Sequence, residues 1–412
     1  MKLSSLIGCL LLGLLPLRAN TDLHIFYYST VEFVETPLSR IRGSVPLSQA
    51  VAMERNHYRF AYDEQQRLVA VSFFNGNTAR QPNHTASLFT LAHRMEFEYG
   101  AGFESVRFYN ESHQEIPVLG NCYRFVYLLD NHGFRTELHF LDQDGQRITN
   151  SWGIYQYDWE YQADGSVIED RFDAVEQQVA IRPGFEFYRL RLRFNLMGHI
   201  ALMQNIDESG ALVENSTGAA QDRISTNASG HFLEWNVLNS KGELERGNGP
   251  DVAIGKQAFN AYGYEVALVH QDEQSQLMTS SYGICQSKTS FDKFGNIQQR
   301  FFYDEDGSPT LHQSAGYHSF LMEWSTDGNQ RTAIRYFDLA AKPCLHRSRG
   351  YHQAKYEYDT QGRLAKVSYH TTDGSLVERK DNQRAYSVFT YDEATGQPSA
   401  KHYSKTDQLL KS

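Results

Sequence analysis

The 412-residue chain has few cysteines, few prolines and no long apolar segment after its first residues. Four cysteines are too few for a disulfide-dense scaffold, and ten prolines are too few for a proline-rich extended chain. Beyond residue 17, no apolar run approaches the roughly 18 to 20 residues of a transmembrane helix. Because 41% of the residues are hydrophobic, the chain can still bury a large core, which excludes a wholly disordered or collagen-like protein.

The first residues have the pattern of a secretory signal peptide. Lys2 precedes an apolar run from Leu6 to Leu17, and we predict cleavage after Ala19, so that residues 1–19 are removed. The loss of Lys2 and Arg18 takes the formal charge from -10 to -12. Such an acidic chain disfavours nucleic acid as a partner. We therefore expect a secreted or periplasmic protein without a transmembrane helix in the mature chain.

A lipoprotein signal is the alternative interpretation of the same segment. The sequence Leu6-Ile7-Gly8-Cys9 resembles a lipoprotein box in which Cys9 would be lipidated. Only eight residues precede Cys9, and the apolar run continues past it. This pattern favours an ordinary signal peptide over lipidation.

Three cysteines remain in the mature chain, and the sequence leaves their state open. They are Cys122, Cys285 and Cys344. One disulfide and one free thiol are compatible with an oxidising compartment, in which case Cys285 with Cys344 is the preferred pair. Three reduced thiols fit the sequence equally well.

Glycines recur in pairs twelve residues apart, and this spacing is the strongest signal in the sequence. The clearest pairs are Gly283/Gly295, Gly316/Gly328 and Gly350/Gly362, which step along the chain by 33 and 34 residues. The spacing recurs at Gly153/Gly165 and Gly230/Gly242, with further Asp-Gly turns at Gly145, Gly307 and Gly374. Between residues 198 and 282 we expect the period to be poorly kept. A fixed period of this length is typical of a tandem repeat protein.

Between the glycines, apolar and polar residues alternate with the period of a half-buried strand. Leu190, Leu192 and Phe194 fall on one face of such a strand. Turn residues beside each strand favour hairpins. Since one hairpin cannot bury its apolar face alone, we predict an all-β fold. Its tandem hairpins, about 33 to 34 residues each, would form an extended or curled antiparallel sheet over residues 56–412.

The segment 20–55 differs from the repeats. Leu23 to Val34 predicts a strand, and Pro46 to Glu54 predicts a helix with Ser44 as a possible N-cap. We expect this segment to cap the first edge of the sheet, because an uncovered edge promotes aggregation.

Several turn sequences resemble a known group of repeats. These are Tyr358-Asp359-Thr360-Gln361-Gly362-Arg363-Leu364, Tyr62-Asp63-Glu64-Gln65-Gln66-Arg67-Leu68 and Tyr391-Asp392-Glu393. They resemble the Tyr-Asp (YD) repeats of RHS-type bacterial proteins, and Trp152-Gly153 resembles the related Trp-Gly (WG) repeats. The resemblance implies β-hairpin sheets that form shells and binding surfaces, and it implies no particular reaction. Gln66 replaces the turn glycine in the first of these sequences.

Common catalytic signatures are absent, and acidic turns are the main chemical lead. The sequence has no Gly-x-Ser-x-Gly elbow, no His-Glu-x-x-His helix, no Cys-x-x-Cys pair and no phosphate-binding Gly-Lys-Ser/Thr loop. The Asp142/Asp144 and Asp304/Asp306 turns share an Asp-x-Asp-Gly form that could present oxygens to Ca²⁺. Neither continues into a complete EF-hand loop, so a role in supporting the turns is favoured.

Histidines and arginines give two weaker candidates. His318 and His352 occupy equivalent repeat positions, with His231 one residue earlier in its own unit, and such a row could act as a general base or simply belong to a polar strand face. The candidate binding stripe is Arg189, Arg191 and Arg193, joined by Arg182. It could bind an anionic glycan, a lipid headgroup or an acidic partner, or pair with acids on neighbouring strands. Trp159 and Trp235 could stack on sugars or pack in the core.

Two functions from different classes fit these observations. The favoured hypothesis is an exported binding surface for a protein or polysaccharide at the cell envelope, with no cofactor. The alternative is a secreted hydrolase of small esters or lactones assisted by Ca²⁺. A purely structural role in the envelope is a third hypothesis.

Overall fold

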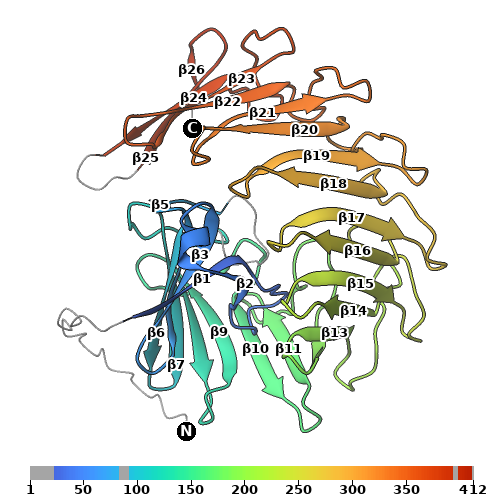
Figure 1. Cartoon of the computed structure of the whole chain (residues 1–412). Coiled ribbons are helices and arrows are strands. Elements are labelled where there is room, and N and C mark those ends of the chain that lie inside the picture. Colours follow the sequence, from blue (N-terminus) through green and yellow to red (C-terminus); the bar gives the residue numbers. More distant parts are fainter. Residues whose placement is uncertain (1–22, 83–91, 393–397, 411–412) are drawn as a thin grey trace.

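The structure is a computed structural model that describes residues 23–82, 92–392 and 398–410, and it is built almost entirely from β-strands (Figure 1). The predicted signal peptide and Cys9 lie outside the described residues. The elements in chain order are β1 (His24–Val31), β2 (Gly43–Leu47), α1 (Gln49–Ala52), β3 (Asn56–Tyr62), β4 (Leu68–Asn75), β5 (Thr78–Ala79), β6 (Arg94–Gly100), β7 (Phe103–Tyr109), β8 (Arg124–Leu129), β9 (Arg135–Leu141), β10 (Gln156–Tyr161), β11 (Val167–Phe172), β12 (Leu190–Phe194), β13 (Ile200–Asn205), β14 (Gln221–Thr226), β15 (Phe232–Leu238), β16 (Ile254–Phe259), β17 (Glu265–Gln271), β18 (Gln286–Phe291), β19 (Ile297–Tyr303), β20 (Ser319–Trp324), β21 (Arg331–Phe337), β22 (Gln353–Tyr358), β23 (Leu364–His370), β24 (Tyr386–Tyr391), β25 (Pro398–Tyr403) and β26 (Leu409–Leu410).

All strands belong to one antiparallel sheet. β2 pairs with β1, β1 pairs with β3, and β4 pairs with β3, with the short β5 and with β6. From β6 to β26 each strand pairs with the next one in the chain. Among the described strands, β2 and β26 form the two ends and do not pair with each other. The prediction of an all-β fold of tandem hairpins in one sheet is confirmed.

Most of the hairpin turns share one backbone conformation. In the turn between β22 and β23, Gly362 has a φ of 79°, and the Oδ1 atom of Asp359 accepts backbone N–H groups from Gln361 and Arg363. An L-residue rarely adopts this φ, so glycine is favoured there, and the Asp side chain completes the turn. The equivalent turn glycines are Gly133, Gly165, Gly198, Gly230, Gly263, Gly295 and Gly328, all with positive φ.

The repeat continues through the middle of the chain, where the sequence analysis expected it to weaken. Gly198, Gly230 and Gly263 occupy successive hairpin turns at the same spacing as the turns on either side. The irregularity lies in other turns, where Asp251 (φ 55°) and Ser275 (φ 61°) adopt the positive φ that glycine has elsewhere. The expectation of a poorly kept period was wrong. At Asp251 and Ser275 the backbone keeps the repeated turn conformation although the residue is not glycine.

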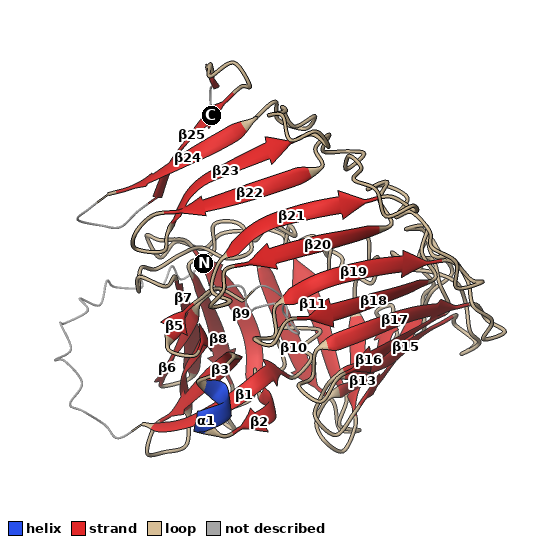
Figure 2. Ribbon diagram, turned by 45° about the horizontal axis from the view of Figure 1, so that its top comes forward, coloured by secondary structure: helices blue, strands red, loops and turns tan. Residues whose placement is uncertain are grey.

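The sheet curls, so that hairpin turns of the C-terminal half contact strands of the N-terminal part (Figures 1 and 2). The N–H of Asn56 in β3 donates to the carbonyl of Phe294 at 2.9 Å. The N–H of Phe33 donates to the carbonyl of Gly230, also at 2.9 Å. These contacts join residues that are far apart in the sequence and enclose an interior.

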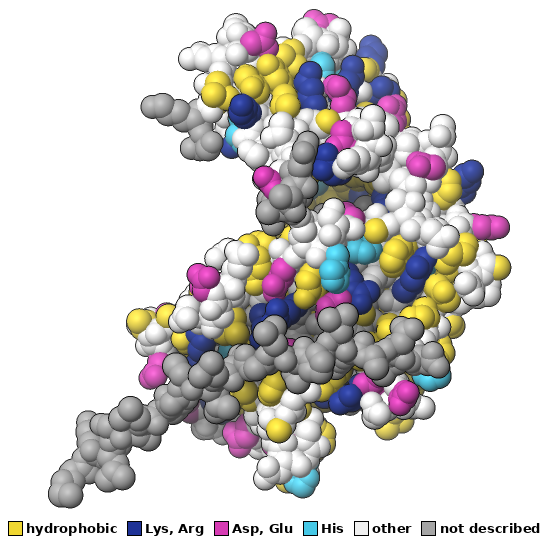
Figure 3. Space-filling view, turned by 90° about the vertical axis from the view of Figure 1, so that its left-hand side faces the viewer, with side chains coloured by type: hydrophobic (Ala, Val, Ile, Leu, Met, Phe, Trp, Pro, Cys, Tyr) yellow, Lys and Arg dark blue, Asp and Glu magenta, His cyan; other side chains and the backbone are white. Residues whose placement is uncertain are grey.

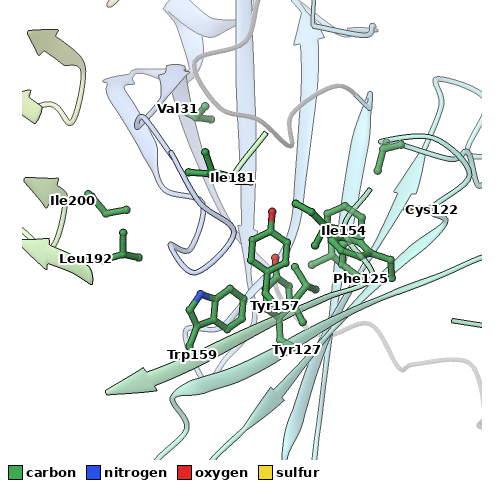
Figure 4. Packing of buried hydrophobic residues seen from close by; sticks show 14 of the residues in the cluster. Val31, Cys122, Phe125, Tyr127, Ile154, Tyr157, Trp159, Ile181, Leu192 and Ile200 are labelled. Carbon is green, nitrogen blue, oxygen red and sulfur yellow. The ribbon is translucent and has the colours of Figure 1, made fainter. Parts of the chain in front are cut away.

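The interior is filled largely by side chains of β3 to β15 and by the chain between β1 and β2. We call residues 32–42 the inner segment. Arg135 in β9 holds it, since its Nη1 atom donates to the carbonyls of Pro37 at 2.7 Å and Leu38 at 3.1 Å. Buried residues around it include Phe125, Tyr157 and Leu192 (Figure 4). A second, smaller core lies between the C-terminal hairpins, and its buried members are Phe320, Tyr336, Tyr351, Ala354, Val367 and Tyr369.

Two predictions about the N-terminal segment need correction. α1 is only four residues long, and its N-cap is Ser48, whose Oγ atom accepts from the N–H of Val51 at 3.3 Å. Ser44 lies in β2 instead, because the segment 43–47 pairs with β1, with Ser44 opposite Thr30 and Pro46 opposite Tyr28. The predicted strand Leu23–Val34 is the shorter β1 (His24–Val31).

The preferred disulfide between Cys285 and Cys344 is also wrong. Cys122, Cys285 and Cys344 are all free thiols, the first two buried. The Sγ atom of Cys285 donates to the carbonyl of His270 at 3.6 Å. Burial raises the pKa of the Cys344 thiol to about 11, which disfavours its reactive thiolate at neutral pH. In the part of the chain that the structure describes, no helix is long and apolar enough to span a membrane.

Candidate binding site

Two adjoining cavities lie inside the curl and form the candidate site. The larger, about 420 Å³, is the Asp222 cavity, and its walls come from the inner segment, β13 to β16 and the loops before β12, β16 and β18. The smaller, about 260 Å³, is the Glu265 cavity. Both are lined by Phe33, Phe232 and Gln257, so the two cavities meet at these side chains.

Parallel aromatic rings form one wall of the Asp222 cavity. The rings of Phe33 and Phe232 stack with centroids 4.4 Å apart, and Phe232 stacks on Trp235 at 5.7 Å. Trp235 lies against the backbone of Gly255 on the neighbouring strand β16, where an added Cβ atom would come within 1.9 Å of the indole. Gly255 is therefore required by the close approach of the indole. The result is a stack of three aromatic rings in a defined position, which makes this wall of the cavity apolar.

Buried charged groups face this aromatic wall. Glu35 of the inner segment forms an ion pair with Arg182, and Asp222 lies nearby on β14. Burial, together with the charge of Glu35, raises the pKa of Asp222 well above its usual value, although Arg182 opposes the shift. The Nδ2 atom of Asn248 donates to Oδ1 of Asp222 at 3.3 Å. The protonated form of Asp222 is thus favoured, and in that form it can donate a hydrogen bond.

The Glu265 cavity repeats this combination of an aromatic wall with an acid and an arginine. Glu265 and Arg300 are 3.9 Å apart, and burial raises the pKa of Glu265 while Arg300 lowers it. Tyr264 and Phe291 stack at 4.9 Å on the wall of the same cavity. Each cavity therefore combines an apolar ring surface with a carboxyl group and a guanidinium group.

His231 borders the Glu265 cavity, but its hydrogen bonds argue against a role as a base. The Oδ1 atom of Asn227 accepts the N–H groups of Ser229 and His231, which leaves its Nδ2 atom facing Nδ1 of His231 at 3.2 Å. Nδ1 must then accept, so Nε2 carries the proton and donates toward Ser44 at 2.9 Å or Thr30 at 3.1 Å. With this tautomer, Nε2 has no lone pair to take a proton from a hydroxyl group.

The structure places the other two predicted histidines, His318 and His352, outside both cavities. His318 and His352 lie at equivalent positions, each directly before its strand, β20 or β22. The Nδ1 atom of His318 contacts the carbonyl of Thr310 at 3.2 Å, and that of His352 contacts the carbonyl of Cys344 at 3.2 Å. Both are buried. Burial lowers the pKa of His352. In the described part of the chain neither forms an ion pair with a carboxylate, so each has the surroundings of a structural histidine.

The predicted arginine stripe is largely paired. Arg189 forms an ion pair with Asp170 at 2.8 Å and Arg193 with Asp164 at 3.1 Å, while Arg191 donates to the carbonyl of Gly210 at 3.4 Å. On the face shown in Figure 3, side chains of both charges are mixed.

The predicted metal ligands lie in ordinary turns. The Oδ1 atom of Asp142 accepts N–H groups from Asp144 at 3.0 Å and Gln146 at 2.8 Å. In the equivalent turn, Asp304 accepts from the N–H of Ser308 at 2.8 Å, and Asp306 is exposed. Within the described ranges, no group of three or more His, Cys, Asp or Glu side chains is placed to hold a metal ion. The turn hydrogen bonds account for Asp142 and Asp304, and Ca²⁺ binding stays a prediction.

Sequence reasoning missed most of the cavity residues. Arg182 was assigned to the basic stripe, but its ion pair with Glu35 places it in the Asp222 cavity. Trp159 is buried and donates from Nε1 to Glu169 at 2.8 Å, so of the two tryptophans considered as sugar platforms only Trp235 lines a cavity. One signal in the sequence could have indicated Asp222 and Glu265. Each is an acidic residue within a predicted strand.

The fold defines the chain as a tandem β-hairpin repeat protein. No protein-family model matches it, and no curated protein matches it significantly. Solved structures with some likeness include a TcdB2–TccC3–TEV crystal structure, at 10% identity and a TM-score of 0.30, over 87% of this chain and 23% of that one. A porin-like protein from Bacteroides uniformis shares 10% identity, with a TM-score of 0.20, over 75% of this chain and 94% of that one. The chain thus spans about a quarter of the TcdB2–TccC3 chain.

Proposed function

We propose that this protein is an exported binding protein of the YD-repeat type, which receives its ligand inside the curl of the sheet at the cell envelope. The observation that carries the proposal is the pair of adjoining cavities, in which aromatic walls face buried and half-buried ionisable groups. Pockets that combine apolar walls with a few convergent polar groups are typical ligand sites. Burying such groups costs free energy, so their presence in the interior favours a role in binding.

The pattern of the first 19 residues supports export. A Lys followed by the apolar run Leu6–Leu17 is typical of a secretory signal peptide. We expect the full-length chain, expressed in a bacterium, to be recovered outside the cytoplasm with Asn20 as its first residue. Cell fractionation followed by N-terminal sequencing tests this, and a cytoplasmic chain that retains Met1 would contradict it.

The Tyr-Asp turns support the repeat type. Arg363 joins two elements of this pattern, since its Nε atom donates to Oδ2 of Asp359 at 2.8 Å and its guanidinium lies 4.2 Å from the ring centre of Tyr391. Arg67 repeats this arrangement with Asp63 at 2.9 Å and Tyr99 at 5.2 Å. The Tyr, Asp and Arg positions thus have a shared physical role in linking successive hairpins.

Hydrogen exchange on the mature protein tests where the ligand binds. We would add a protein-free polysaccharide extract or, separately, the protein fraction of a bacterial envelope. Binding inside the curl should slow amide exchange in the inner segment and in β14 to β16. Protection confined to other parts of the sheet would overturn the proposed location.

A matched pair of variants sharpens this test. Gln257 lines both cavities and is half-buried, so Gln257→Trp should obstruct them and abolish the protection. Gln298 is exposed on β19 and lines neither cavity, so Gln298→Trp should leave it intact. Equal effects of the two substitutions would contradict binding inside the curl.

A further inference from the structure

The two cavities have a chemistry that narrows the class of ligand. The aromatic wall of the Asp222 cavity is a stack of Phe33, Phe232 and Trp235, in which Phe232 and Trp235 have an interplanar angle of 13°. All three rings line the cavity and give it an apolar surface. Flat rings of this kind pack against ligands with one apolar face. Asp222, Asn248 and Gln257 line the same cavity and offer hydrogen-bond donors and acceptors. A ligand that fits must therefore combine an apolar ring face with polar groups around its edge.

The arginine in each cavity already has an acidic partner, which disfavours a charged ligand. Each cavity is lined by a single arginine, and each arginine already faces an acid: Arg182 pairs with Glu35, and Arg300 lies 3.9 Å from Glu265. An anionic ligand would have to compete with these carboxylates for the guanidinium groups. A cationic ligand would have to draw the carboxylates away from the arginines. Either exchange would leave a buried or half-buried charge without its partner, which is costly.

A wholly apolar ligand is disfavoured for the converse reason. Glu35 and Asp222 expose only 7% and 5% of their surface, so a hydrocarbon in the cavity would remove the remaining contact with water. Buried polar groups that lose water without gaining a hydrogen bond destabilise a complex. A ligand with several hydroxyl groups replaces that water, and adjacent hydroxyls can bind to acids and amides together.

The cavities also suggest an extended ligand. The Asp222 cavity, at about 420 Å³, is within the range of roughly 300 to 1,000 Å³ that holds small ligands. The Glu265 cavity adjoins it across Phe33, Phe232 and Gln257, and it presents its own ring surface and acid–arginine pair. The same set of groups thus occurs twice in succession, as a ligand with a repeated unit would require.

We propose that the two cavities are successive subsites for a neutral oligosaccharide, with a sugar ring packed against Trp235 in the Asp222 cavity and the next ring in the Glu265 cavity. This inference rests on the proposed function, since it names the ligand class of the same interior site. The carboxyl, amide and guanidinium groups hydrogen-bond to the hydroxyls, while the aromatic rings cover the C–H face of the sugar.

Isothermal titration calorimetry of the mature protein, residues 20–412, tests the inference. The neutral probes are di- and trisaccharides of glucose, galactose, mannose and N-acetylglucosamine, and the anionic probes are digalacturonate and sialyllactose. We expect at least one neutral saccharide to bind with 1:1 stoichiometry, and its trisaccharide to bind more tightly than its disaccharide. Binding of the anionic probes alone, or of no saccharide, would overturn the inference.

Three variants assign the binding to this site. Trp235→Ala removes the ring surface, and Gly255→Ala displaces the indole without removing it; each should weaken binding at least tenfold. Trp152→Ala is the control, because Trp152 is also partly buried but lines neither cavity, and it should change the affinity less than twofold. Thermal unfolding shows that each variant is folded. Unchanged affinity in both folded cavity variants would overturn the assignment.

The outcome is separable from that of the proposed function. If a protein or another non-carbohydrate ligand protects the inner segment and Gln257→Trp abolishes that protection, the binding role stands and the oligosaccharide inference fails. If neither saccharides nor envelope fractions protect the interior, both fail.

Discussion

At the scale of single residues, the backbone at the turns is more regular than the sequence. A second row of turns has positive φ throughout: Gly145, Glu176, Gly210, Gly242, Ser275, Gly307, Ala341, Gly374 and Asp407. The left-handed conformation costs an L-residue about 1 to 2 kcal/mol, because its Cβ atom crowds the following carbonyl oxygen. Residues such as Ala341 (φ 57°) therefore carry strain that the equivalent glycines avoid.

This difference predicts opposite effects of two matched substitutions. Ala341→Gly should raise the free energy of unfolding by about 1 kcal/mol or less, since relief of strain is partly offset by the greater entropy of glycine in the unfolded chain. Gly307→Ala should lower it by about 1 kcal/mol, because the strain is again partly offset by the smaller entropy of alanine in the unfolded chain. No atom beyond the neighbouring residues lies within 4 Å of the Cβ that this substitution would add. The change in the free energy of unfolding therefore reports the backbone conformation and not a steric clash. Urea unfolding curves of both variants measure these shifts, and a stabilising Gly307→Ala would contradict the argument.

Asp222 predicts a dependence of stability on pH. Burial and the charge of Glu35 raise the pKa of Asp222 in the folded protein, while Arg182 is the facing cation. The folded state then holds a proton that the unfolded state has released, so this residue lowers stability as the pH rises above the ordinary carboxyl pKa of about 3.9. Asp222→Asn removes the titration. The melting temperature of the variant should match the wild type in acid and exceed it increasingly toward neutral pH.

A constant offset between the two melting profiles would contradict this explanation. Asp207→Asn is a suitable control, because Asp207 lies in an exposed turn and hydrogen bonds from Ser209 and backbone N–H groups lower its pKa. Its loss should produce the opposite trend, with a deficit in stability that is present at neutral pH and disappears as the pH falls.

At the scale of elements, aromatic side chains of the C-terminal hairpins form hydrogen bonds with the hairpin before them. The hydroxyl of Tyr358 donates to the carbonyl of Arg331 at 2.9 Å, and that of Tyr391 donates to Leu364 at 3.0 Å. The indole of Trp324 makes the same contact with Ile297 at 2.9 Å. All three contacts span 27 residues, so they repeat with the units. These bonds fix neighbouring hairpins beyond what strand pairing provides.

Removing one such hydroxyl should have a measurable cost. Tyr358→Phe should lower the free energy of unfolding by about 1 kcal/mol, because the hydrogen bond is lost while the ring still packs. Tyr356→Phe is the control, since the hydroxyl of Tyr356 forms no hydrogen bond within the described residues and its ring, 4.4 Å from the Arg331 guanidinium, is kept. Chemical denaturation compares the two. An equal loss in both variants would show that the bond to Arg331 is not the cause.

At the scale of the whole molecule, Arg80 fastens the curl. Its Nη1 atom donates to Oδ1 of Asn56 at 2.8 Å, to Oδ1 of Asn296 at 3.1 Å and to the carbonyl of Gly328 at 2.8 Å. One side chain therefore joins β3 to two hairpin turns of the C-terminal half. Hydrogen bonds from a charged donor contribute about 1.5 to 3 kcal/mol. Here they add to other hydrogen bonds across the same junction, such as that from Nδ2 of Asn75 to the carbonyl of Asp327 at 2.9 Å.

Arg80→Met should loosen this junction while the hairpins stay folded. Amide exchange should accelerate at Asn56, whose N–H donates to the carbonyl of Phe294 across the same junction. Exchange within β22 and β23 should not change, because those strands are held by each other. Arg363→Met, at a turn in those strands, is the control. Hydrogen exchange measured by mass spectrometry gives these rates. Unaltered exchange at Asn56 in the Arg80→Met variant would contradict the role of Arg80.

The sequence by itself determined the hairpins, because turn conformation and strand alternation are local properties. An Asp or Asn three residues before a glycine closes the turn with its own side chain, as Asp359 does at Gly362, and the alternation of Leu190 and Leu192 with arginines sets the buried face. Where a turn lacks glycine, as at Ser275, the sequence pattern no longer predicts the turn, although the backbone keeps the same positive φ.

Only the tertiary structure decided how the sheet curls and what the curl encloses. Glu35, Arg182 and Asp222 lie in three separate parts of the chain and meet only because the inner segment passes through the curl. Strand pairing likewise sets Trp235 against Gly255 and holds Ser44 in β2. The physical reason is that the direction of curling depends on contacts such as that of Arg80 with distant turns, and no local pattern in the sequence encodes which turns these will be.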